Sequence, residues 1–478
     1  MEEFLFRIDE VRWRLSMEAM AGMKVPGLIY ADTEIMEQAL RDNALVQVAN
    51  VACLPGIRNF SFAMPDIHQG YGFPIGGVAA FDLQEGVISP GGVGYDICCG
   101  VRLLVSDIEK EQITPVLDSL ASSIYSRVPS GVGSKVSAKL SQKELQRVLE
   151  SGAVWAVEKG MGDVGDLDFI ENRGCYEQAD PASVSDRAKK RGLAQLGTLG
   201  SGNHFLEVQV VDRIFERSSA AVMGLREGAI TVMVHCGSRG LGHQVCDDYI
   251  RIMARSMDHY GIRVPDRQLC SVPVLSREGK DYMGAMYSAA NFALANRQII
   301  TCRLREVFSR FFPGRDLKLL YDVSHNMAQV EEHSFETSSS SRVCVHRKGA
   351  TRALPPGHPL LPEVYRETGQ PVLVPGSMGT ASYVLAGTAR GGKECFASTC
   401  HGAGRIMSRH FARKETDGNR VRQELKQRGI IVKAESLSTV SEEKPSAYKD
   451  VERVIEVVEK AGIGKKIARL RPLAVIKG

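Results

Sequence analysis

Residues 91–100 of this 478-residue chain, GGVGYDICCG, constrain its fold more than any other stretch. Glycines, which allow positive φ and a close approach of backbone to ligand, lead into Asp96 and Cys99. If residues 96–99 form one tight turn, the carboxylate and the thiol share a face. Such a pair suits a borderline transition metal but cannot complete its coordination shell. The rest of the chain must therefore bring further ligands to this turn.

Histidines at the ends of apolar, strand-like runs are the candidates. Residues 230–234, 319–323 and 396–400 read as strands, and the histidines that stand directly after or beside such runs are His204, His235, His325 and His401. A lone histidine in this setting is more often a satisfied core residue. Several together indicate a site, because enzymes built on sheets place their chemistry at strand ends. The pattern predicts a metal site that joins these strand ends to the Asp96 turn.

Two glycine-rich loops leave their roles open. Residues 64–77 contain Asp66, which either caps backbone donors of a turn or supports the site. Residues 375–382, PGSMGTAS, offer backbone N–H groups and hydroxyls, as a phosphate or nucleotide cradle does, but an ordinary turn has the same composition. Tyr448 is a candidate for stacking on a base.

The remaining pattern predicts an α/β fold. Helices are expected at residues 34–45, 130–151 and 282–312, with a further helical run after the glycines of 402–404. Residues 46–53 read as a strand, and residues 160–180 and 337–341 read as loops. The basic run 187–191 is either a solvated helix face or a contact to a phosphate backbone.

Composition sets broad limits. Hydrophobic residues make up 44% and charged residues 24%, as in ordinary soluble globular proteins, and the length fits one large domain or two. The formal charge of +4 is too small to mark a polyanion binder by itself. Eleven cysteines in so long a chain show no disulfide framework and favour a reducing cytosol. We see no signal peptide and no apolar run of membrane-spanning length, so we expect a cytoplasmic protein without a membrane partner.

The motifs taken together resemble the RtcB-type RNA-splicing ligases, which join RNA ends with GTP and manganese. The matching runs, in family order, are GYDICCGVR, GSGNHFLE, VHCGSRGLGHQ, SHN, HRKGATR, PGSMGTAS and HGAGR. They extend over most of the chain and are specific as a set. The resemblance implies a single domain, residues 1–478, with a central metal- and GTP-binding cleft at strand ends.

The resemblance also implies site residues. Two Mn²⁺ ions would be bridged by Cys99, with Asp96 and His204 completing one site and His235 and His325 the other. His401 would be the nucleophile that accepts GMP. The implied GTP contacts, which overlap these, are Asn203, His204, Phe205, Leu206, Glu207, His325, Asn326, Pro375, Gly376, Ser377, Met378, Ser382, His401, Gly402, Ala403, Gly404, Tyr448 and Lys477.

The implied reaction joins RNA 3′-phosphate or 2′,3′-cyclic phosphate ends to 5′-hydroxyl ends, in tRNA splicing or RNA repair. Arg191, Arg239 and Arg409 are candidates for holding RNA phosphates. The need for an activating protein such as archease stays open. One departure is visible: the family usually has asparagine where Cys98 stands, so Cys98 is a candidate extra soft ligand or oxidation site.

Two other functions remain as alternatives. A dinuclear metal-dependent phosphoesterase acting on RNA would explain the ligand cluster but not His401 on its glycine loop. A non-catalytic RNA-binding protein with a structural metal would need a closed, cysteine-rich site, for which Cys236, His243 and Cys246 are the candidates.

Overall fold

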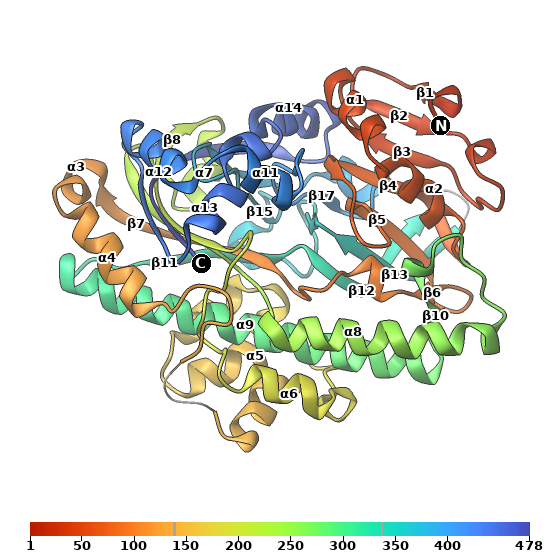
Figure 1. Cartoon of the computed structure of the whole chain (residues 1–478), viewed down its shortest axis with the longest axis horizontal. Coiled ribbons are helices and arrows are strands. Elements are labelled where there is room, and N and C mark those ends of the chain that lie inside the picture. The colour runs from red at the N-terminus through yellow and green to blue at the C-terminus, as the bar shows by residue number, and fades with distance from the viewer. Residues whose placement is uncertain (137–139, 336–337) are drawn as a thin grey trace.

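Two large β-sheets form the framework of the protein, and the computed structural model describes them within residues 1–136, 140–335 and 338–478 (Figure 1). The expected mixed α/β fold is confirmed. The seven-stranded sheet has the order β1 (Leu5–Arg7), β2 (Arg12–Leu15), β3 (Gly27–Tyr30), β4 (Ile57–His68), β5 (Ile75–Asp82), β13 (Ser338–Lys348) and β12 (Asn326–Phe335).

The eight-stranded sheet carries two of the predicted strands that lead into histidines, residues 230–234 and 319–323. Of the third, 396–400, only residues 398–400 form a strand, and it lies outside this sheet. The order of the eight-stranded sheet is β11 (Lys318–Ser324), β7 (Gly100–Glu109), β9 (Ala229–Cys236), β8 (Phe205–Ile214), β19 (Lys465–Lys477), β16 (Ser382–Ala386) and β15 (Pro371–Val374), with β18 (Ile431–Ala434) parallel to β19. Two short ribbons pair β6 (Val87–Ile88) with β10 (Val272–Pro273), and β14 (Ala350–Arg352) with β17 (Ser398–Cys400). Strand β9 is buried along its whole length, as its β-branched sequence favours.

Strand register brings the predicted ligands to the same end of neighbouring strands in this sheet. Gly100 at the start of β7 pairs with both Ser324 and Cys236, and His235 pairs with Phe205. His325 is the single residue between β11 and β12, so the chain passes at this point from one large sheet to the other. The strand ends at which these histidines lie are therefore also the point where the chain connects the two sheets.

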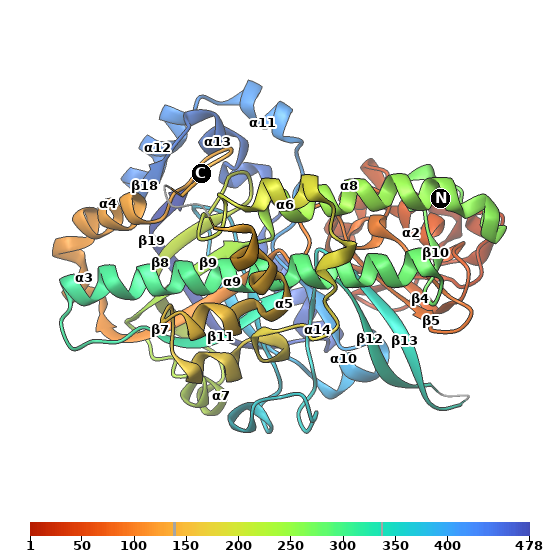
Figure 2. The ribbon, with the colours of Figure 1, turned by 90° about the horizontal axis from the view of Figure 1, so that it is seen from below.

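Three long helices cover one side of the sheets: α9 (Arg277–Phe311), α8 (Arg239–Ser256) and α5 (Gln142–Glu158). In Figure 2, α8 and α9 run along the molecule, with α5 and α6 (Asp186–Gly192) packed against them. The shorter α-helices are α1 (Thr33–Arg41), α2 (Ala44–Ala52), α3 (Lys110–Ile113), α4 (Leu117–Arg127), α6 (Asp186–Gly192), α7 (Arg217–Val222), α10 (Ala389–Glu394), α11 (Arg409–Glu415), α12 (Gly418–Gln427), α13 (Leu437–Glu442) and α14 (Val451–Ala461).

Short 3₁₀ helices connect many of these elements. They are η1 (Glu2–Phe4), η2 (Met17–Ala19), η3 (Pro90–Gly92), η4 (Thr114–Val116), η5 (Val164–Phe169), η6 (Glu171–Gly174), η7 (Pro181–Ser183), η8 (Met257–Tyr260), η9 (Arg267–Leu269), η10 (Glu363–Tyr365) and η11 (Pro445–Ala447). In the described part of the chain, we find no helix with both the length and the apolar character needed to span a membrane. The single-domain boundaries, 1–478, stay a prediction.

Several local predictions were wrong. Residues 46–53 belong mostly to helix α2, because a short apolar run buried on most sides looks alike as helix or strand. The polar helix expected from residue 130 begins at Gln142, where Ser141 forms a capping box with Glu144. Residues 160–180 contain η5 and η6 rather than a plain loop, and β13 begins at Ser338, with residue 337 outside the described residues. No helix starts at the glycines of 402–404; α11 begins at Arg409.

A buried ion cluster ties α9 to the sheet. The Asp322 carboxylate on β11 accepts hydrogen bonds from Arg102 Nε (2.7 Å) on β7 and from Arg297 Nε and Nη2 (both 2.8 Å) on α9. All three side chains are fully buried. Arg102 also donates to Gln298 and Thr301 on α9, so the helix is held at several points.

Asp322→Asn should therefore lower the free energy of unfolding by about 3–5 kcal/mol, because it leaves buried guanidinium groups without a counter-charge. Denaturant unfolding monitored by circular dichroism measures the loss. The matched control is Asp168→Asn, since Asp168 pairs with Arg173 on the surface, where both side chains are more than half exposed. That change should cost less than about 1 kcal/mol. Equal effects of the two substitutions would contradict the role assigned to the buried cluster.

Candidate active site

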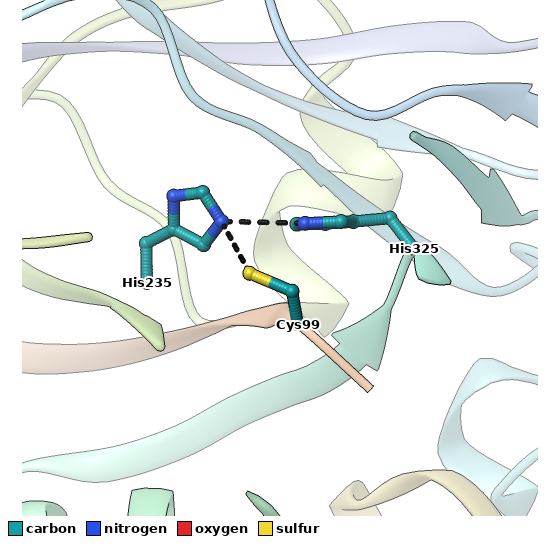
Figure 3. Close-up of side chains that lie close together, drawn as sticks. All are labelled: Cys99, His235 and His325. Carbon is teal, nitrogen blue, oxygen red and sulfur yellow. Dashed lines mark hydrogen bonds between the residues drawn. The ribbon is translucent and has the colours of Figure 1, made fainter. Parts of the chain in front are cut away.

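Five predicted metal ligands converge at the junction of the sheets. One group consists of Cys99, His235 and His325, shown in Figure 3, and a second consists of Asp96, Cys99 and His204. In each group the candidate ligand atoms all lie within 4.8 Å of one another. Cys99 belongs to both groups. The expected turn is present, because the backbone N–H of Cys99 donates to the carbonyl of Asp96 (3.0 Å).

The distances within the groups leave little room between ligand atoms. Cys99 Sγ lies 3.2 Å from His235 Nε2 and 3.5 Å from His204 Nε2. His235 Nε2 lies 3.3 Å from His325 Nε2, and His204 Nε2 lies 2.7 Å from Asp96 Oδ2. Nitrogen, sulfur and carboxylate oxygen converging from five side chains form a mixed donor set of the kind that transition metals accept.

The pKa shifts divide the candidate ligands: burial would lower the pKa of His204, but Cys236, Asp96 and Cys99 raise it, whereas His235 and His325 shift the other way. Burial lowers the pKa of His235 and of His325 well below the ordinary value, so both rings are neutral and offer a lone pair. Burial, followed by the Asp96 charge, raises the pKa of the Cys99 thiol to about 12. Burial alone would raise the pKa of Asp96, but His204 overrides this and lowers it. A metal ion would supply the positive charge that a buried thiolate requires, as metal coordination does elsewhere.

The surroundings fix the orientation of the ligands. The Nδ1–H of His204 donates to the carbonyl of Leu199 (3.0 Å), which leaves Nε2 to face Asp96 and Cys99. Gly237 makes room for Asp96, because a Cβ at that position would lie 2.5 Å from Asp96 Oδ1. Asp96 Oδ1 is buried and has no hydrogen-bond partner among the described residues, as expected for an atom that faces an ion.

His401 lies beside the metal ligands without belonging to either group. Its ring centroid is 4.8 Å from that of His325. Asp66 on β4, fully buried, accepts hydrogen bonds through Oδ2 from His401 Nδ1 (2.5 Å), from the His401 backbone N–H (3.0 Å) and from the Gly402 backbone N–H (3.3 Å). Of the two roles left open for Asp66, the structure therefore places it in support of the site. A donating Nδ1–H leaves the lone pair on His401 Nε2.

A cavity of about 210 Å³ opens next to His401. Fourteen of the residues implied as GTP contacts line it: Asn203, Phe205, His325, Asn326, Pro375, Gly376, Ser377, Met378, His401, Gly402, Ala403, Gly404, Tyr448 and Lys477. The wall also includes His68, His235, Arg405 and Glu443. The loop 375–382 is thus brought to the same cavity as His401.

Four of the implied contacts lie behind this wall. His204 faces Asp96, and Leu206 is buried in the hydrophobic core. The Ser382 hydroxyl accepts hydrogen bonds from the backbone N–H of Gly376 (3.2 Å) and from Gln209 Nε2 (3.1 Å). The same Gln209 amide donates to Glu207 Oε2 (2.7 Å), and burial raises the pKa of Glu207 to about 8. Ser382 and Glu207 therefore support the cavity loop from behind.

Glu443 organises the cationic side of the cavity, and sequence reasoning missed it. Its buried carboxylate accepts hydrogen bonds from Tyr448 OH, from Arg405 Nη1 (3.2 Å) and from Arg409 Nε (3.1 Å). Lys477 Nζ lies 4.0 Å from the same carboxylate. Burial would raise the pKa of Glu443, but Lys477, Arg409 and Arg405 lower it. No local motif marked Glu443, because its partners come from distant segments.

Other predicted residues take different places. Cys98 has φ 53° and is buried, with its carbonyl accepting from Arg297, and it belongs to neither ligand group, so it is not an extra ligand. Within the described residues, Cys236, His243 and Cys246 do not form a ligand group. Arg239 Nη1 lies 3.5 Å from His204 Nδ1, whereas Arg191 is exposed on α6.

Comparison with known proteins gives the same family throughout. The chain matches the family model described as tRNA-splicing ligase RtcB over residues 47–478. A tRNA-splicing ligase RtcB from Thermococcus kodakarensis is 54% identical over 99% of both chains. One from Archaeoglobus fulgidus is 50% identical over 100% of both chains. An RNA-splicing ligase RtcB from Mycobacterium tuberculosis is 54% identical over 91% of this chain and 100% of its own.

Cys99→Ala should abolish metal binding at both ligand groups, because it removes the one side chain that they share. Metal content after dialysis against Mn²⁺, measured by mass spectrometry, tests this. The matched control is the neighbouring Cys98→Asn, which should keep its metal, since Cys98 lies outside both groups. Full metal content in Cys99→Ala, or an equal loss in both variants, would refute the bridging role.

Proposed function

The chain belongs to the RtcB family of tRNA-splicing ligases, and from this premise we propose that it joins RNA ends through a GMP–His401 intermediate. The ends would be an RNA 3′-phosphate, or a 2′,3′-cyclic phosphate opened first to a 3′-phosphate, and a 5′-hydroxyl. One observation carries the proposal. His401 is held by a buried carboxylate next to a metal-ligand cluster that does not need it as a ligand.

His401 has the features of a nucleophile. Asp66 accepts the Nδ1–H, so the lone pair resides on Nε2, and the ring faces the cavity. Attack of Nε2 on the α-phosphorus of GTP would form a phosphorus–nitrogen bond as the bond to pyrophosphate breaks. Asp66 would stabilise the positive charge that the ring acquires, as the carboxylate does in other carboxylate–histidine pairs.

The metal ligands would hold two Mn²⁺ ions, one at Asp96, Cys99 and His204 and one at Cys99, His235 and His325. Bound cations would polarise phosphoryl oxygens and offset developing negative charge. The chain's own contribution is to fix the ligands at the sheet junction and to keep His401 apart from them. The mixed donor set and the buried thiol support this assignment.

The cavity fits the nucleotide by its chemistry. The Ser377 hydroxyl lies on one wall, in a loop that the Gly376–Ser382 hydrogen bond holds in place, and Lys477, Arg405 and Arg409 provide positive charge on another. The Arg405 guanidinium lies 4.9 Å from the centroid of the Tyr448 ring, in a cation–π contact. Anionic phosphates and a planar base match these surfaces.

The later steps follow from the family. The enzyme-bound GMP would pass to the RNA 3′-phosphate, and His401 would be released. The 5′-hydroxyl would then attack this activated phosphate, forming the new phosphodiester and expelling GMP. Exposed Arg191 is the candidate for a phosphate contact on the approaching strand.

Incubation with Mn²⁺ and α-labelled GTP should leave label on the chain that survives alkali and is lost in acid. His401→Ala should carry no label while keeping its metal. Asp66→Asn should slow labelling by roughly 10²–10⁴-fold, because the ring loses its orienting acceptor. The control is His410→Ala, which removes an exposed histidine on α11 and should label normally.

Label retained in His401→Ala would exclude this residue as the nucleophile. Absence of label in the wild-type protein, tested with and without an archease-type activator, would favour the metal-dependent phosphoesterase instead. Release of phosphate from RNA ends without joining would then be its activity.

Arg191→Glu should reduce joining of RNA more than self-guanylylation, because charge reversal acts on the strand and not on GTP. Arg191 is a cleaner choice than Arg239, which contacts His204, or Arg409, which pairs with Glu443 in the cavity. Joining and labelling rates measured on the same preparation test this. A parallel fall in both rates would assign Arg191 to the fold or to the GTP site.

A further inference from the structure

Three aromatic side chains, Tyr71, Tyr95 and His243, lie together beside the metal ligands, and we call them the aromatic ledge. The Tyr95 and His243 rings are stacked, with centroids 5.9 Å apart and planes at 27°. Tyr71 meets Tyr95 edge to face at 5.4 Å. His243 is exposed, and the two tyrosines are half-buried. The chemistry proposed above makes no use of these rings.

Hydrogen bonds fix the backbone at Tyr71 in the aromatic ledge. The buried amino group of Lys348 donates to the backbone carbonyl of Tyr71 and to that of Gly91 (3.1 Å). The next residue after Tyr71, Gly72, donates its N–H to Gln268 Oε1 (2.8 Å). A rigid aromatic surface binds a flat ligand with little loss of conformational entropy.

The ledge lies on the side of the metal groups that the nucleotide cavity does not use. Tyr95 directly precedes Asp96, whose side chain is 17% exposed. The cavity wall includes His235, His325 and His401 but not Asp96. Asp96, next to Tyr95, therefore keeps some exposure to solvent outside the wall of the nucleotide cavity.

Positive charge accompanies the ledge. Arg191 on α6 donates from Nη1 to Gln244 Oε1 (3.2 Å), the neighbour of His243 on α8. A Cβ at Gly240, one turn earlier on α8, would lie 3.1 Å from Arg191 Nε, so the guanidinium lies along the same helix face.

The two acids near this face, Asp247 and Asp248, both have hydrogen-bond partners, and these include Gln244, which also holds Arg191. Asp247 pairs with Arg251, and Asp248 accepts from Gln244 Nε2 (2.8 Å) and from the Ser185 hydroxyl (2.6 Å). The face therefore presents a ring and a cation side by side, which is the combination that single-stranded nucleic acid recognises.

We propose that the aromatic ledge binds a base of the RNA strand near its reacting end, with the base stacked on His243 and a neighbouring phosphate on Arg191. The proposal rests on the function proposed above and adds the route of the RNA, which enters from the Asp96 side. Stacking accepts any base, because every base has a π-face, so the ledge would tolerate many sequences at a broken or spliced end.

The test compares His243→Ala with His243→Phe, which keeps a flat ring. The probe is a fluorescent single-stranded RNA of about ten nucleotides with a 3′-phosphate, bound in Mn²⁺ without GTP and followed by anisotropy. His243→Ala should weaken binding by about 5–100-fold, and His243→Phe should stay within about threefold of wild type. The matched control is His259→Ala, since His259 is an exposed histidine that also contacts a tyrosine, Tyr260, but lies beyond the far end of α8.

Equal RNA affinity of His243→Ala and wild type would overturn the proposal, and so would an equal loss in His243→Phe, which would point to the imidazole rather than to stacking. Self-guanylylation of the same variants is measured in parallel and should not fall with RNA affinity. Failure of the wild-type protein to guanylylate would count against the proposed function. The RNA affinities of the His243 variants test the role of the aromatic ledge independently of that result.

Discussion

The buried guanidinium of Arg297 is the contact on which the site depends. Its Nε and Nη2 bind Asp322, which lies three residues before His325, and its Nη1 donates to the carbonyls of Cys98 (2.9 Å) and Cys236 (2.7 Å). Cys98 directly precedes Cys99, and Cys236 directly follows His235. One side chain on α9 thus fixes the backbone beside three of the five candidate ligands. A charge buried this deeply is tolerated because Asp322 neutralises it and carbonyls take its remaining N–H groups.

The candidate metal ligands were easier to predict from the sequence than the residues that hold the site in place. Histidines after β-branched strands and the Asp96–Cys99 turn are local signals, and the antiparallel register of β11, β7, β9 and β8 places Cys99, His235 and His325 near one another. Asp66 and Glu443 gave no comparable signal, because Asp66 meets His401 across 335 residues and Glu443 gathers partners from several segments. Helix α2 was mistaken for a strand because its valines and alanines are buried nearly all round.

The histidines and cysteines of the site differ in role because they differ in burial and in the hydrogen bonds that they form besides those with the ligand groups. His204, His235, His325 and His401 share one sequence setting, yet His401 alone among them bonds a buried aspartate through Nδ1. The adjacent Cys98 and Cys99 differ as sharply, because the positive φ of Cys98 turns the chain so that only Cys99 joins the ligand groups. Sequence motifs identify such residues as a set, whereas the hydrogen-bond partners assign each one its role.

The joint at His325 ties metal binding to the order of folding. The residue before it is paired in one large sheet and the residue after it in the other, so His325 reaches its place once both sheets are assembled. The Ser324–Gly100 pairing joins segments far apart in sequence, and such non-local contacts form slowly, whereas Asn326 and Lys348 pair within the hairpin of β12 and β13. An ion that recognises the completed ligand set stabilises the finished chain over half-assembled forms by mass action. For a chain that binds an ion at this joint, the yield of native protein on refolding would depend on the metal present as well as on the polypeptide.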